Sequence, residues 1–448
     1  MMNDLLQQPP EAIRRIQNDQ LQTQLQLGAR GHDFYREQWQ QAGIDIASIR
    51  TVEDLAKLPL TSKHDLMDNP ERFRLHCPDL PVHERALWEV LHTSGSTGDP
   101  TPIYITSHDY QAYLLQARRV AEISGITDRD RLANLFPLTP AAMGSFTRSE
   151  ANAYAAGASV VGDLTGAPWG DYDMHRSLDA AVRMVERHQC AVLWGVTSFV
   201  RRVIMRAAEL GADFRHVRMC GVTGEASTPA MREDIRTRLR DIGAADTIIF
   251  DRYGSTESGG LAQCREEGDW HNPAPEMIYH EVVDPDTGQP LPDGERGALA
   301  ISLLARRGTV LLRYLVGDVV SLTHEPCPHC GRTGDRVVGP VVRTKDLVKV
   351  KGMLINPTAL MEGLRTVPGV DEFQVVVTKQ DLRDPFSMDE MVVRVASQRQ
   401  DREALSGSLV TAAQQAVGVR PRVEFVAANA IYDPGQEAKS KRLIEERG

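Results

Sequence analysis

The chain has 448 residues, more than a single hydrophobic core usually organises, and this length predicts two domains. Hydrophobic residues make up 42% of the chain and charged residues 25%, which is ordinary for a soluble globular protein. The formal net charge is -10, from 51 basic and 61 acidic residues, and no long basic run occurs. Nucleic acid is therefore excluded as the principal partner, because binding to its phosphates requires concentrated Lys and Arg.

The first ten residues show no cationic start followed by an apolar core, so they do not indicate a secretory signal. No stretch reaches the roughly 18 consecutive apolar residues of a membrane span. We expect a cytoplasmic protein without a membrane partner.

The N-terminal region predicts helices. Residues 11–42 carry apolar side chains at helical spacing, which indicates one or two amphipathic helices. Thr51 is a candidate N-cap for a further short helix over 52–55. These helices are expected to pack on the outside of the larger domain.

From residue 85 to about 320, apolar strands alternate with helical segments, which favours parallel sheets covered by helices. The expected strands include 132–136, 158–161 and 191–194, with helices over 177–187 and 197–210. Ligands of such sheets bind beyond the carboxyl ends of the strands. Two turn clusters, at 284–288 and 291–295, predict an antiparallel hairpin subdomain.

The segment after Arg343 is long enough for a small separate domain. Its apolar runs predict strands over 373–377 and 391–395, followed by a helix over 401–417. The fold class expected for the whole chain is α/β, with helix-covered sheets and the hairpin subdomain in a large N-terminal part and a small α+β domain at the C-terminus.

Residues 92–101, with the sequence HTSGSTGDPT, form a loop rich in glycine and hydroxyl groups. Such a loop can turn N–H and O–H donors toward one anion, as a phosphate cradle does. It is not a Walker-type loop, because Gly98 is followed by Asp99 where a lysine would be needed. Taken alone, the loop is equally consistent with an ordinary polar surface turn.

Further motifs follow in order: DRYGSTE at 251–257, RYLVGD at 313–318, and RTKD at 343–346 leading into KVKG at 349–352. With the loop at 92–101, they make the chain resemble the acyl-adenylate-forming enzymes, most closely the phenylacetate-CoA ligase branch. The stretches DFYRE at 33–37 and DLAKLPLTSKHDL at 54–66 extend the resemblance over nearly the whole chain. The resemblance implies an AMP-binding adenylation domain over 1–344 and a mobile C-terminal domain over 345–448, with a hinge near Lys345.

The resemblance also implies a role for individual residues in holding ATP. Hydroxyl groups of the loop would bind the β and γ phosphates, Tyr253 would stack on adenine, and Asp318 would bind the ribose. Glu257 would hold Mg²⁺, a cation that prefers oxygen ligands. The implied nucleotide-binding set is Thr93, Ser94, Ser96, Thr97, Gly224, Glu225, Asp251, Tyr253, Gly254, Thr256, Asp318, Arg343 and Lys351. For Glu257 the alternative is a solvated surface acid, and for Asp318 and Arg343 it is a surface ion pair.

Two positions depart from the family pattern near the nucleotide. Asp99 stands where the branch often has lysine, and Ala226 stands where proline more often follows the glutamate. The first departure removes a cation near the phosphates.

Near the C-terminus, Lys439 resembles the mobile lysine that approaches the carboxylate and the α-phosphate, and with Glu257 it completes the implied catalytic pair. Ala438 replaces the glycine that usually precedes this lysine, and Lys441 is close enough to compete for the role. The alternative interpretation is a plain basic tail.

Four residues form a separate constellation. Cys264 and His271 precede a Cys-x-x-Cys turn, and three thiolates with one imidazole suit a tetrahedral structural zinc; the predicted ligands are Cys264, His271, Cys327 and Cys330. His329 is a rival ligand, and four unligated residues are the alternative. The single residues Cys77, Cys190 and Cys220 are expected to be buried and inert.

The function implied by the resemblance is an ATP-dependent, AMP-forming acyl-CoA ligase that activates an aromatic or arylacetic acid. It would use ATP, Mg²⁺, CoA as co-substrate and a structural Zn²⁺. An apolar slot for the acid could be lined by Phe136, Pro137, Met143, Phe146, Trp194 and Phe199, or these could be ordinary core residues.

Two alternatives stay open. An adenylating enzyme could pass the acyl group to an amine or a carrier-protein thiol, and a nucleotide-binding regulator would have no activity. The sequence is compatible with a homodimer and does not determine the oligomeric state.

Overall fold

The computed structural model describes residues 5–93, 100–137, 144–162, 177–225, 227–343, 348–350, 353–355, 357–382, 387–435, 437 and 439–447. The chain forms two compact units, and each draws on segments that are distant in the sequence. Unit 1 comprises Met1–Asp130, Pro140–Val160 and Arg252–Val342, and unit 2 comprises Arg131–Thr139, Val161–Asp251 and Arg343–Gly448.

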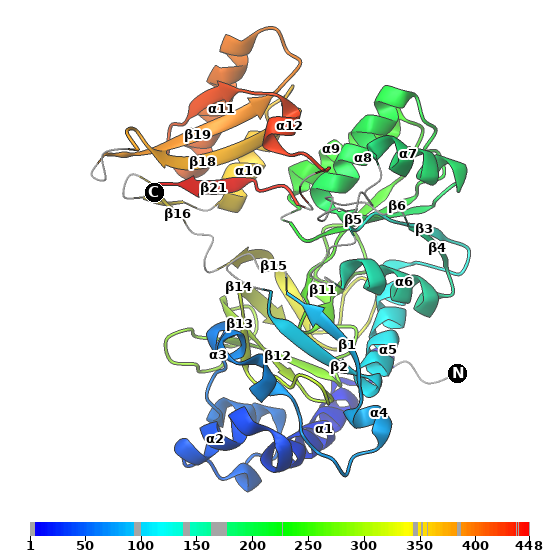
Figure 1. Cartoon of the computed structure of the whole chain (residues 1–448), viewed down its shortest axis with the longest axis vertical. Helices are drawn as coiled ribbons and strands as arrows, with labels where there is room; N and C mark the ends of the chain where they lie inside the picture. Colours follow the sequence, from blue (N-terminus) through cyan, green and yellow to red (C-terminus); the bar gives the residue numbers. More distant parts are fainter. Residues whose placement is uncertain are drawn as a thin grey trace, which may run out of the picture. The chain divides into compact units, whose positions relative to one another are not determined.

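The centre of unit 1 is a six-stranded sheet whose described pairings are antiparallel (Figure 1). Its strand order is β10 (Ala262–Gln263), β11 (Trp270–His271), β15 (Arg336–Arg343), β14 (Tyr314–Thr323), β13 (Gly297–Leu303) and β12 (Ile278–Val283). The turn clusters at 284–288 and 291–295 lie between β12 and β13, which pair from Ile278 with Leu303 to Val283 with Ala298. The predicted antiparallel hairpin is therefore present.

Two smaller antiparallel pairs also belong to unit 1. Strand β1 (Leu87–His92) pairs with β2 (Pro102–Thr106), and β8 (Gly254–Ser255) pairs with β9 (Gly259–Gly260). The expectation of parallel sheets from residue 85 onward was too broad, because apolar runs alone do not distinguish parallel from antiparallel partners. The parallel strands lie in unit 2.

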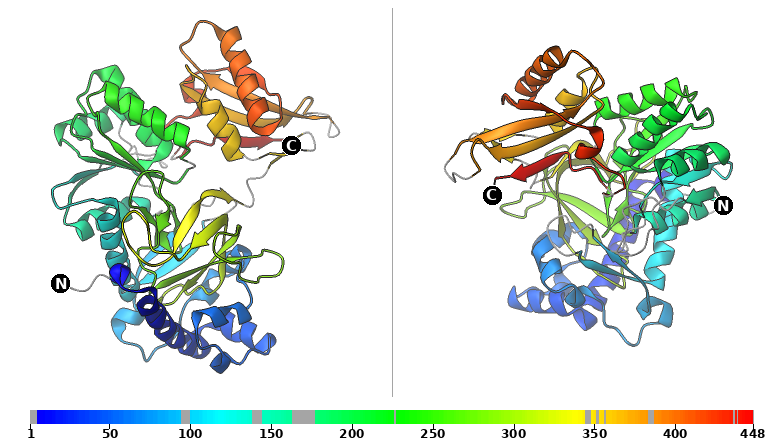
Figure 2. Two further views of the ribbon diagram at one scale, coloured as in Figure 1. Left: turned by 180° about the vertical axis from the view of Figure 1, so that it is seen from behind. Right: turned by 45° about the horizontal axis from the view of Figure 1, so that its top comes forward.

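The N-terminal helices pack on the six-stranded sheet (Figures 1 and 2). Leu21, Leu25 and Trp39 from the helices share one hydrophobic cluster with Leu299 and Ile301 of β13. The helical elements of this unit are η1 (Leu5–Gln7), α1 (Pro10–Gly31), α2 (Asp33–Gln41), η2 (Ile46–Ser48), η3 (Val52–Lys57), α3 (Lys63–Asp68), η4 (Pro70–Phe73), α4 (Val82–Arg85), α5 (Ser107–Ser124) and α6 (Ser145–Ala156). The helices expected over 11–42 and after Thr51 are thus present.

A buried arginine ties the N-terminal region to the sheet. Arg313 forms a two-point ion pair with Glu281 of β12, at 2.9 and 3.1 Å, and donates to the carbonyl oxygen of Leu58 at 2.6 Å. A buried charge requires this degree of pairing to offset its lost hydration. The arginine of the RYLVGD motif therefore has a structural role.

Unit 2 contains a five-stranded sheet in the order β4 (Ser159–Gly162), β3 (Arg131–Asn134), β5 (Val192–Val196), β6 (Met219–Thr223) and β7 (Ile248–Asp251). The pairs β3–β5, β5–β6 and β6–β7 are parallel. Neighbouring parallel strands need a crossover connection, which is usually a helix. The connecting helices are α7 (Leu178–Arg187), α8 (Thr197–Leu210) and α9 (Pro229–Asp241). Residues that follow β6 and β7 meet at one edge of this sheet.

The C-terminal part of unit 2 is an α+β arrangement, as predicted. A four-stranded sheet has the order β20 (Arg422–Phe425), β19 (Asp389–Ala396), β18 (Glu372–Lys379) and β21 (Leu443–Glu446), beside a small pair of β16 (Val348–Val350) and β17 (Met353–Ile355). Leu360 of α10 (Pro357–Arg365) and Leu405 of α11 (Arg402–Val417) pack against Val375 and Val393, so both helices cover one face of the sheet (Figure 2). The short α12 (Ala428–Ile431) precedes the last strand.

The fold class is confirmed: helix-covered sheets, a hairpin subdomain and a small α+β part are all present. The domain boundary at 344/345 stays a prediction, and Lys345 lies outside the described residues. Among the helices that the structure describes, none combines the length and apolar character needed to cross a bilayer.

Candidate active site and metal centre

Tyr253 and Asp318 meet in unit 1. The Tyr253 hydroxyl donates to Asp318 Oδ2 at 2.7 Å, and Asp318 is buried on β14. Gly254 follows Tyr253, and a Cβ at this glycine would lie 2.3 Å from the carbonyl oxygen of Gly259, so no other residue fits this hairpin. Two side chains that the sequence predicted for adenine and ribose are therefore adjacent.

Glu257 lies in the turn between β8 and β9 and is held at two points. The Tyr314 hydroxyl donates to Glu257 Oε1 at 3.1 Å, and Arg306 donates to the Glu257 carbonyl oxygen at 3.0 Å. Burial, and then the neighbouring Glu257 charge, raise the pKa of Tyr314, so this hydroxyl keeps its proton and remains a donor. The carboxylate predicted for Mg²⁺ thus has a fixed orientation.

Thr93 stands at the base of the glycine-rich loop. Its N–H donates to the Thr101 carbonyl oxygen at 3.0 Å, and its hydroxyl accepts from the Thr101 N–H at 3.0 Å. These two bonds bring the ends of the loop together. Ser94, Ser96 and Thr97 lie outside the described residues.

In unit 2, Gly224 and Glu225 follow β6. Gly224 has φ +81°, a conformation that glycine adopts without strain. The Glu225 carboxylate accepts from the Ser198 N–H at 3.0 Å and the Ser198 hydroxyl at 2.8 Å, both at the start of α8. It also accepts from the Ser440 N–H at 2.6 Å. The carboxylate is thus occupied by protein donors.

Lys439 lies beside Gly224. A Cβ at Gly224 would lie 3.5 Å from Lys439 Nζ, whereas Lys441 is exposed. Asp251, at the end of β7, forms an ion pair with Arg232 at 3.8 Å. Of the two lysines that competed in the sequence, Lys439 is the one placed at the loop after β6.

For the remaining residues predicted to bind the nucleotide, the structure gives only their position in the fold. Thr256 is half-buried in the β8–β9 turn, and Arg343 is the last residue of β15. Lys351 and the Arg343 side chain lie outside the described part of the chain.

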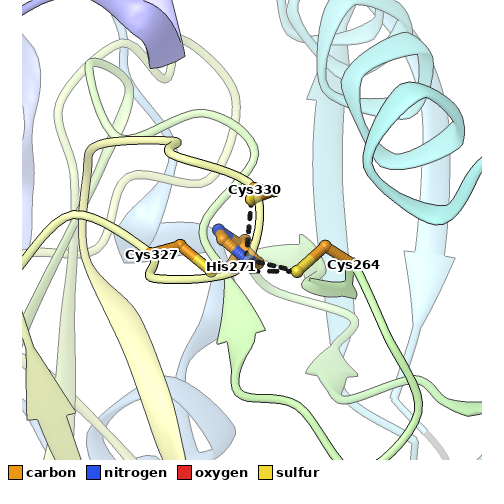
Figure 3. Close-up of side chains that lie close together, drawn as sticks. All are labelled: Cys264, His271, Cys327 and Cys330. Carbon is orange, nitrogen blue, oxygen red and sulfur yellow. Dashed lines mark hydrogen bonds between the residues drawn. The ribbon is translucent and has the colours of Figure 1, made fainter.

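The four residues predicted for zinc gather in unit 1 (Figure 3). The Sγ atoms of Cys264 and Cys327 are 3.8 Å apart, and His271 Nε2 lies 3.4 Å from Cys264 Sγ and 3.7 Å from Cys330 Sγ. Tetrahedral zinc with bonds of about 2.3 Å to sulfur and about 2.0 Å to nitrogen requires about 3.8 Å between sulfurs and about 3.5 Å between sulfur and nitrogen. His329 is exposed and is not among the gathered ligands. The observed spacing fits one zinc ion.

The local electrostatics also suit a metal. Burial and the neighbouring thiols of Cys330 and Cys327 raise the pKa of Cys264 to about 12, so these sulfurs do not all ionise without a cation between them. Burial, aided by Arg336 and Arg332, lowers the pKa of His271 to about 4. The imidazole is therefore neutral at pH 7, as a zinc ligand must be.

Sequence reasoning did not find the residues that hold these groups. Tyr314, Arg306, Ser198 and Ser440 orient predicted site residues. Arg306, Ser198 and Ser440 have no distinctive spacing in the sequence. Tyr314 lies four residues before Asp318 on one β-strand, and this even spacing predicts that the two side chains share a sheet face. This spacing is the sequence signal that could have identified Tyr314 as a neighbour of the site.

Tyr253 and Asp318, the residues implied for adenine and ribose, are thus adjacent on a loop and a strand of unit 1, and the chain also forms a parallel sheet and a small α+β part. A family model described as AMP-binding enzyme matches residues 9–305, and one described as AMP-binding enzyme C-terminal domain matches residues 352–447. The chain belongs to the AMP-binding enzyme family.

Curated relatives and solved structures agree with this assignment. The chain is 28% identical to the phenylacetate-coenzyme A ligase of Thermus thermophilus, over 93% of this chain and 89% of the relative. It is 25% identical to the Escherichia coli phenylacetate-coenzyme A ligase, over 98% and 95% of the two chains. A solved 2-hydroxyisobutyryl-CoA ligase, in the postadenylation state with R3-HIB-AMP, superposes with a TM-score of 0.78 at 23% identity, covering 98% of this chain and 90% of that one. The resemblance to the phenylacetate-CoA ligase branch is confirmed, and the structural likeness supports the fold.

Proposed function

We propose that the protein is an ATP-dependent, AMP-forming acyl-CoA ligase that activates an aromatic or arylacetic carboxylic acid. The observation that carries the proposal is that two hydrogen bonds join the 251–257 motif to β14 in unit 1: one from Tyr253 to Asp318 and one from Tyr314 to Glu257. The full-length likeness to phenylacetate-coenzyme A ligases supports the reaction type and the substrate class.

The chemistry proceeds in two half-reactions. The substrate carboxylate attacks the α-phosphate of ATP, the bond from that phosphorus to the bridging oxygen breaks, and pyrophosphate leaves. The CoA thiolate then attacks the acyl carbon and AMP departs. The protein contributes positioning and charge neutralisation.

Each predicted residue has a part in this scheme. Tyr253 offers its ring to adenine, and Asp318 accepts hydrogen bonds from the ribose hydroxyls. Glu257 would hold Mg²⁺, and the bound cation would supply positive charge at the phosphates. Thr93 closes the loop whose hydroxyls bind those phosphates, and Lys439 supplies a positive charge where the carboxylate meets the α-phosphate.

The remaining nucleotide contacts belong to the same proposal. Gly224 and the backbone of Glu225 would form the loop beside the adenine edge, while the Glu225 carboxylate stays with its protein donors. Asp251, Gly254, Thr256, Arg343 and Lys351 complete the binding residues.

The acid pocket is proposed from residues around β3 and β5 of unit 2. Phe136, Trp194 and Phe199 are buried there, and Pro137 is buried beside them. Aromatic side chains of this kind bind apolar rings. Phe146 is half-buried in unit 1, and Met143 lies outside the described residues.

We also propose a structural zinc ion bound by the Cys264, His271, Cys327 and Cys330 side chains. Four protein ligands would close its coordination, so the ion would stabilise the fold and take no part in the reaction. It would join the loop after β10 to the turn before β15.

Pyrophosphate release tests the proposal directly. We would measure it with a panel of aryl, arylacetic, aliphatic and short hydroxy acids, with and without CoA. Acid-dependent release with stoichiometric CoA consumption is expected for an aryl or arylacetic acid. Release that CoA does not accelerate would favour an amine or carrier-protein acceptor, and preference for a small hydroxy acid would overturn the substrate class.

A further inference from the structure

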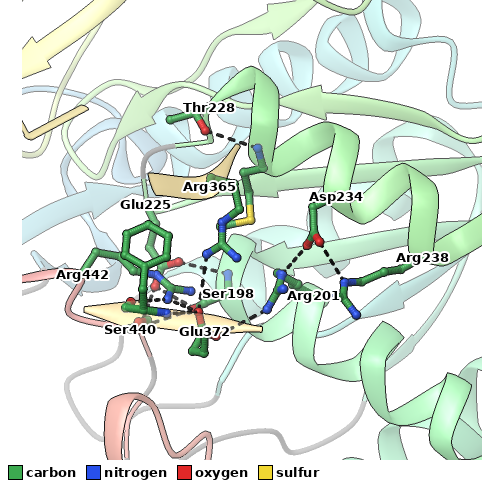
Figure 4. Close-up of polar contacts among 12 residues, drawn as sticks. Ser198, Arg201, Glu225, Thr228, Asp234, Arg238, Arg365, Glu372, Ser440 and Arg442 are labelled. Atoms are coloured by element: carbon green, nitrogen blue, oxygen red, sulfur yellow. Dashed lines mark hydrogen bonds and ion pairs between the residues drawn. The ribbon is translucent and has the colours of Figure 1, made fainter. Parts of the chain in front are cut away.

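The segment that carries Lys439 is fastened to an acidic side chain from a distant part of unit 2. The backbone N–H of Ser440 donates to Glu225 Oε1 at 2.6 Å, across 215 residues of sequence (Figure 4). Ser440 is buried, with 6% of its surface exposed, so water does not compete freely for this bond. A charged acceptor makes the bond stronger than one between neutral groups.

Glu225 is itself held rigidly. Its carboxylate accepts from the N–H and the hydroxyl of Ser198, at 3.0 and 2.8 Å. Burial raises its pKa, while the nearby Arg442 charge and the bonds from Ser198 and Ser440 favour the ionised form. Three protein donors therefore occupy a carboxylate at the end of a parallel strand, which makes it a firm anchor.

The other end of the segment is fixed by a buried ion cluster. Arg442 donates to the Glu372 carboxylate and, at 2.9 Å, to the Phe373 carbonyl oxygen. Glu372 Oε2 also lies 3.5 Å from Arg201 Nη1 on α8. Residues 439–442 are thus held on both sides, by Glu225 at Ser440 and by Glu372 at Arg442 (Figure 4).

We propose that Glu225 is a positioning residue that fixes the backbone next to Lys439, so that the lysine ammonium reaches the reacting carboxylate and α-phosphate. This inference rests on the proposed function, in which Lys439 acts in adenylation. It gives Glu225 a role apart from contact with adenine. A lysine on an unfastened chain end would lose its alignment, and small misplacements of reacting groups reduce rates strongly.

Half-reaction kinetics test the proposal. Glu225→Ala should lower acid-dependent pyrophosphate release at least tenfold, and Glu225→Gln, which keeps one acceptor oxygen, should lower it less. Thioester formation from supplied acyl-AMP should stay within twofold of the wild-type rate. Equal losses in both half-reactions would overturn the proposal.

A matched control is available in the same unit. Glu362 of α10 accepts from the Ala230 N–H of α9 at 3.1 Å, so it also joins the C-terminal elements to a helix of the parallel sheet, but not at Lys439. Glu362→Ala should leave adenylation within twofold. A loss as large as that of Glu225→Ala would show that general docking, and not positioning of Lys439, explains the effect.

A double-variant comparison separates positioning from nucleotide contact. Lys439→Ala alone should reduce adenylation, and adding Glu225→Ala should cause little further loss, because the anchor then has no lysine to place. AMP affinity should be the same in Glu225→Ala and the wild type. Additive losses with weakened AMP binding would assign Glu225 to adenine instead.

Amide hydrogen exchange gives a readout that needs no turnover. The Ser440 N–H should exchange at least tenfold faster in Glu225→Ala than in the wild type or in Glu362→Ala. Unchanged exchange would refute the anchor. If the wild type released no pyrophosphate with any acid, the proposed function would fail, yet the exchange rates would still decide whether Glu225 holds the segment.

Discussion

The Tyr253 hydroxyl donates a hydrogen bond to the Asp318 carboxylate at 2.7 Å, across 65 residues of sequence. The bond directs one carboxylate oxygen and leaves the Tyr253 ring as a flat apolar surface. Tyr253 also packs near Trp270, with ring centroids 5.9 Å apart. A ring for adenine and an acceptor for ribose are therefore oriented together.

This pairing predicts graded effects on nucleotide binding. Tyr253→Phe keeps the ring but removes the donor, and should weaken AMP binding about threefold. Asp318→Asn removes a charged acceptor, which is worth about 1.5 kcal/mol or more, and should weaken it at least tenfold. Calorimetry with AMP checks both. Tyr279→Phe, a control in another part of unit 1, should bind AMP normally; unchanged affinity in Asp318→Asn would remove Asp318 from the ribose site.

Tyr314 is expected to control the Mg²⁺ requirement through Glu257. Tyr314→Phe preserves the buried ring but deletes the donor at 3.1 Å, so the carboxylate loses its fixed orientation. The Mg²⁺ concentration for half-maximal pyrophosphate release should rise about threefold to tenfold, with little change in KM for the acid. Tyr104→Phe, which removes a hydroxyl bonded to Glu71, is the matched control. An unaltered Mg²⁺ titration in Tyr314→Phe would contradict the coupling.

The cysteine and histidine cluster predicts near one zinc ion per chain by metal analysis. Cys264→Ser should abolish the bound zinc and destabilise the protein by several kcal/mol, because binding of a structural metal contributes directly to folding. Cys190→Ala, which alters a buried thiol elsewhere, should retain one zinc even if it lowers stability. Zinc-free wild-type protein of unchanged melting temperature would argue against the site.

Glu372 should make stability depend on pH in the acid range. Burial alone would raise its pKa, but Arg442, Arg201 and Arg365 outweigh burial and lower the pKa to about 2, from 4.5. Because the folded-state pKa is the lower one, the carboxylate contributes stability that is present above pH 4.5 and lost as pH falls toward 2. The loss should approach 3 kcal/mol, at about 1.4 kcal/mol per pKa unit.

Urea denaturation at several pH values would measure this dependence. Glu372→Gln should be less stable than the wild type at pH 7, because it leaves buried guanidinium groups without their carboxylate. Its stability should also change less between pH 4.5 and 2. The exposed Glu403→Gln should follow the wild-type curve. Parallel curves for the wild type and Glu372→Gln would show that Glu372 does not titrate in this window.

Local sequence determined the elements and the family. Apolar periodicity predicted the helix over 197–210 and the strands near 191–194 and 373–377, because burial of one face imposes a period on the residues that form it. Two clusters of turn residues predicted the hairpin around 284–295. The motifs at 92–101, 251–257 and 313–318 carry the resemblance to the adenylate-forming enzymes, because each is a contiguous run of residues that can be recognised without the fold. The zinc ligands were predicted from residue type, because three cysteines and one histidine suit a tetrahedral zinc site.

Only the tertiary structure decided which distant residues form hydrogen bonds with one another. The Tyr253–Asp318, Tyr314–Glu257 and Glu225–Ser440 contacts join residues that are 65, 57 and 215 positions apart. Such pairs leave no periodic signal, because they depend on which strand ends and loops the sheets bring together. Strand direction was likewise decided by pairing in space, which is why the sheets around residues 87–106 and 254–343 are antiparallel although their apolar runs alone did not say so.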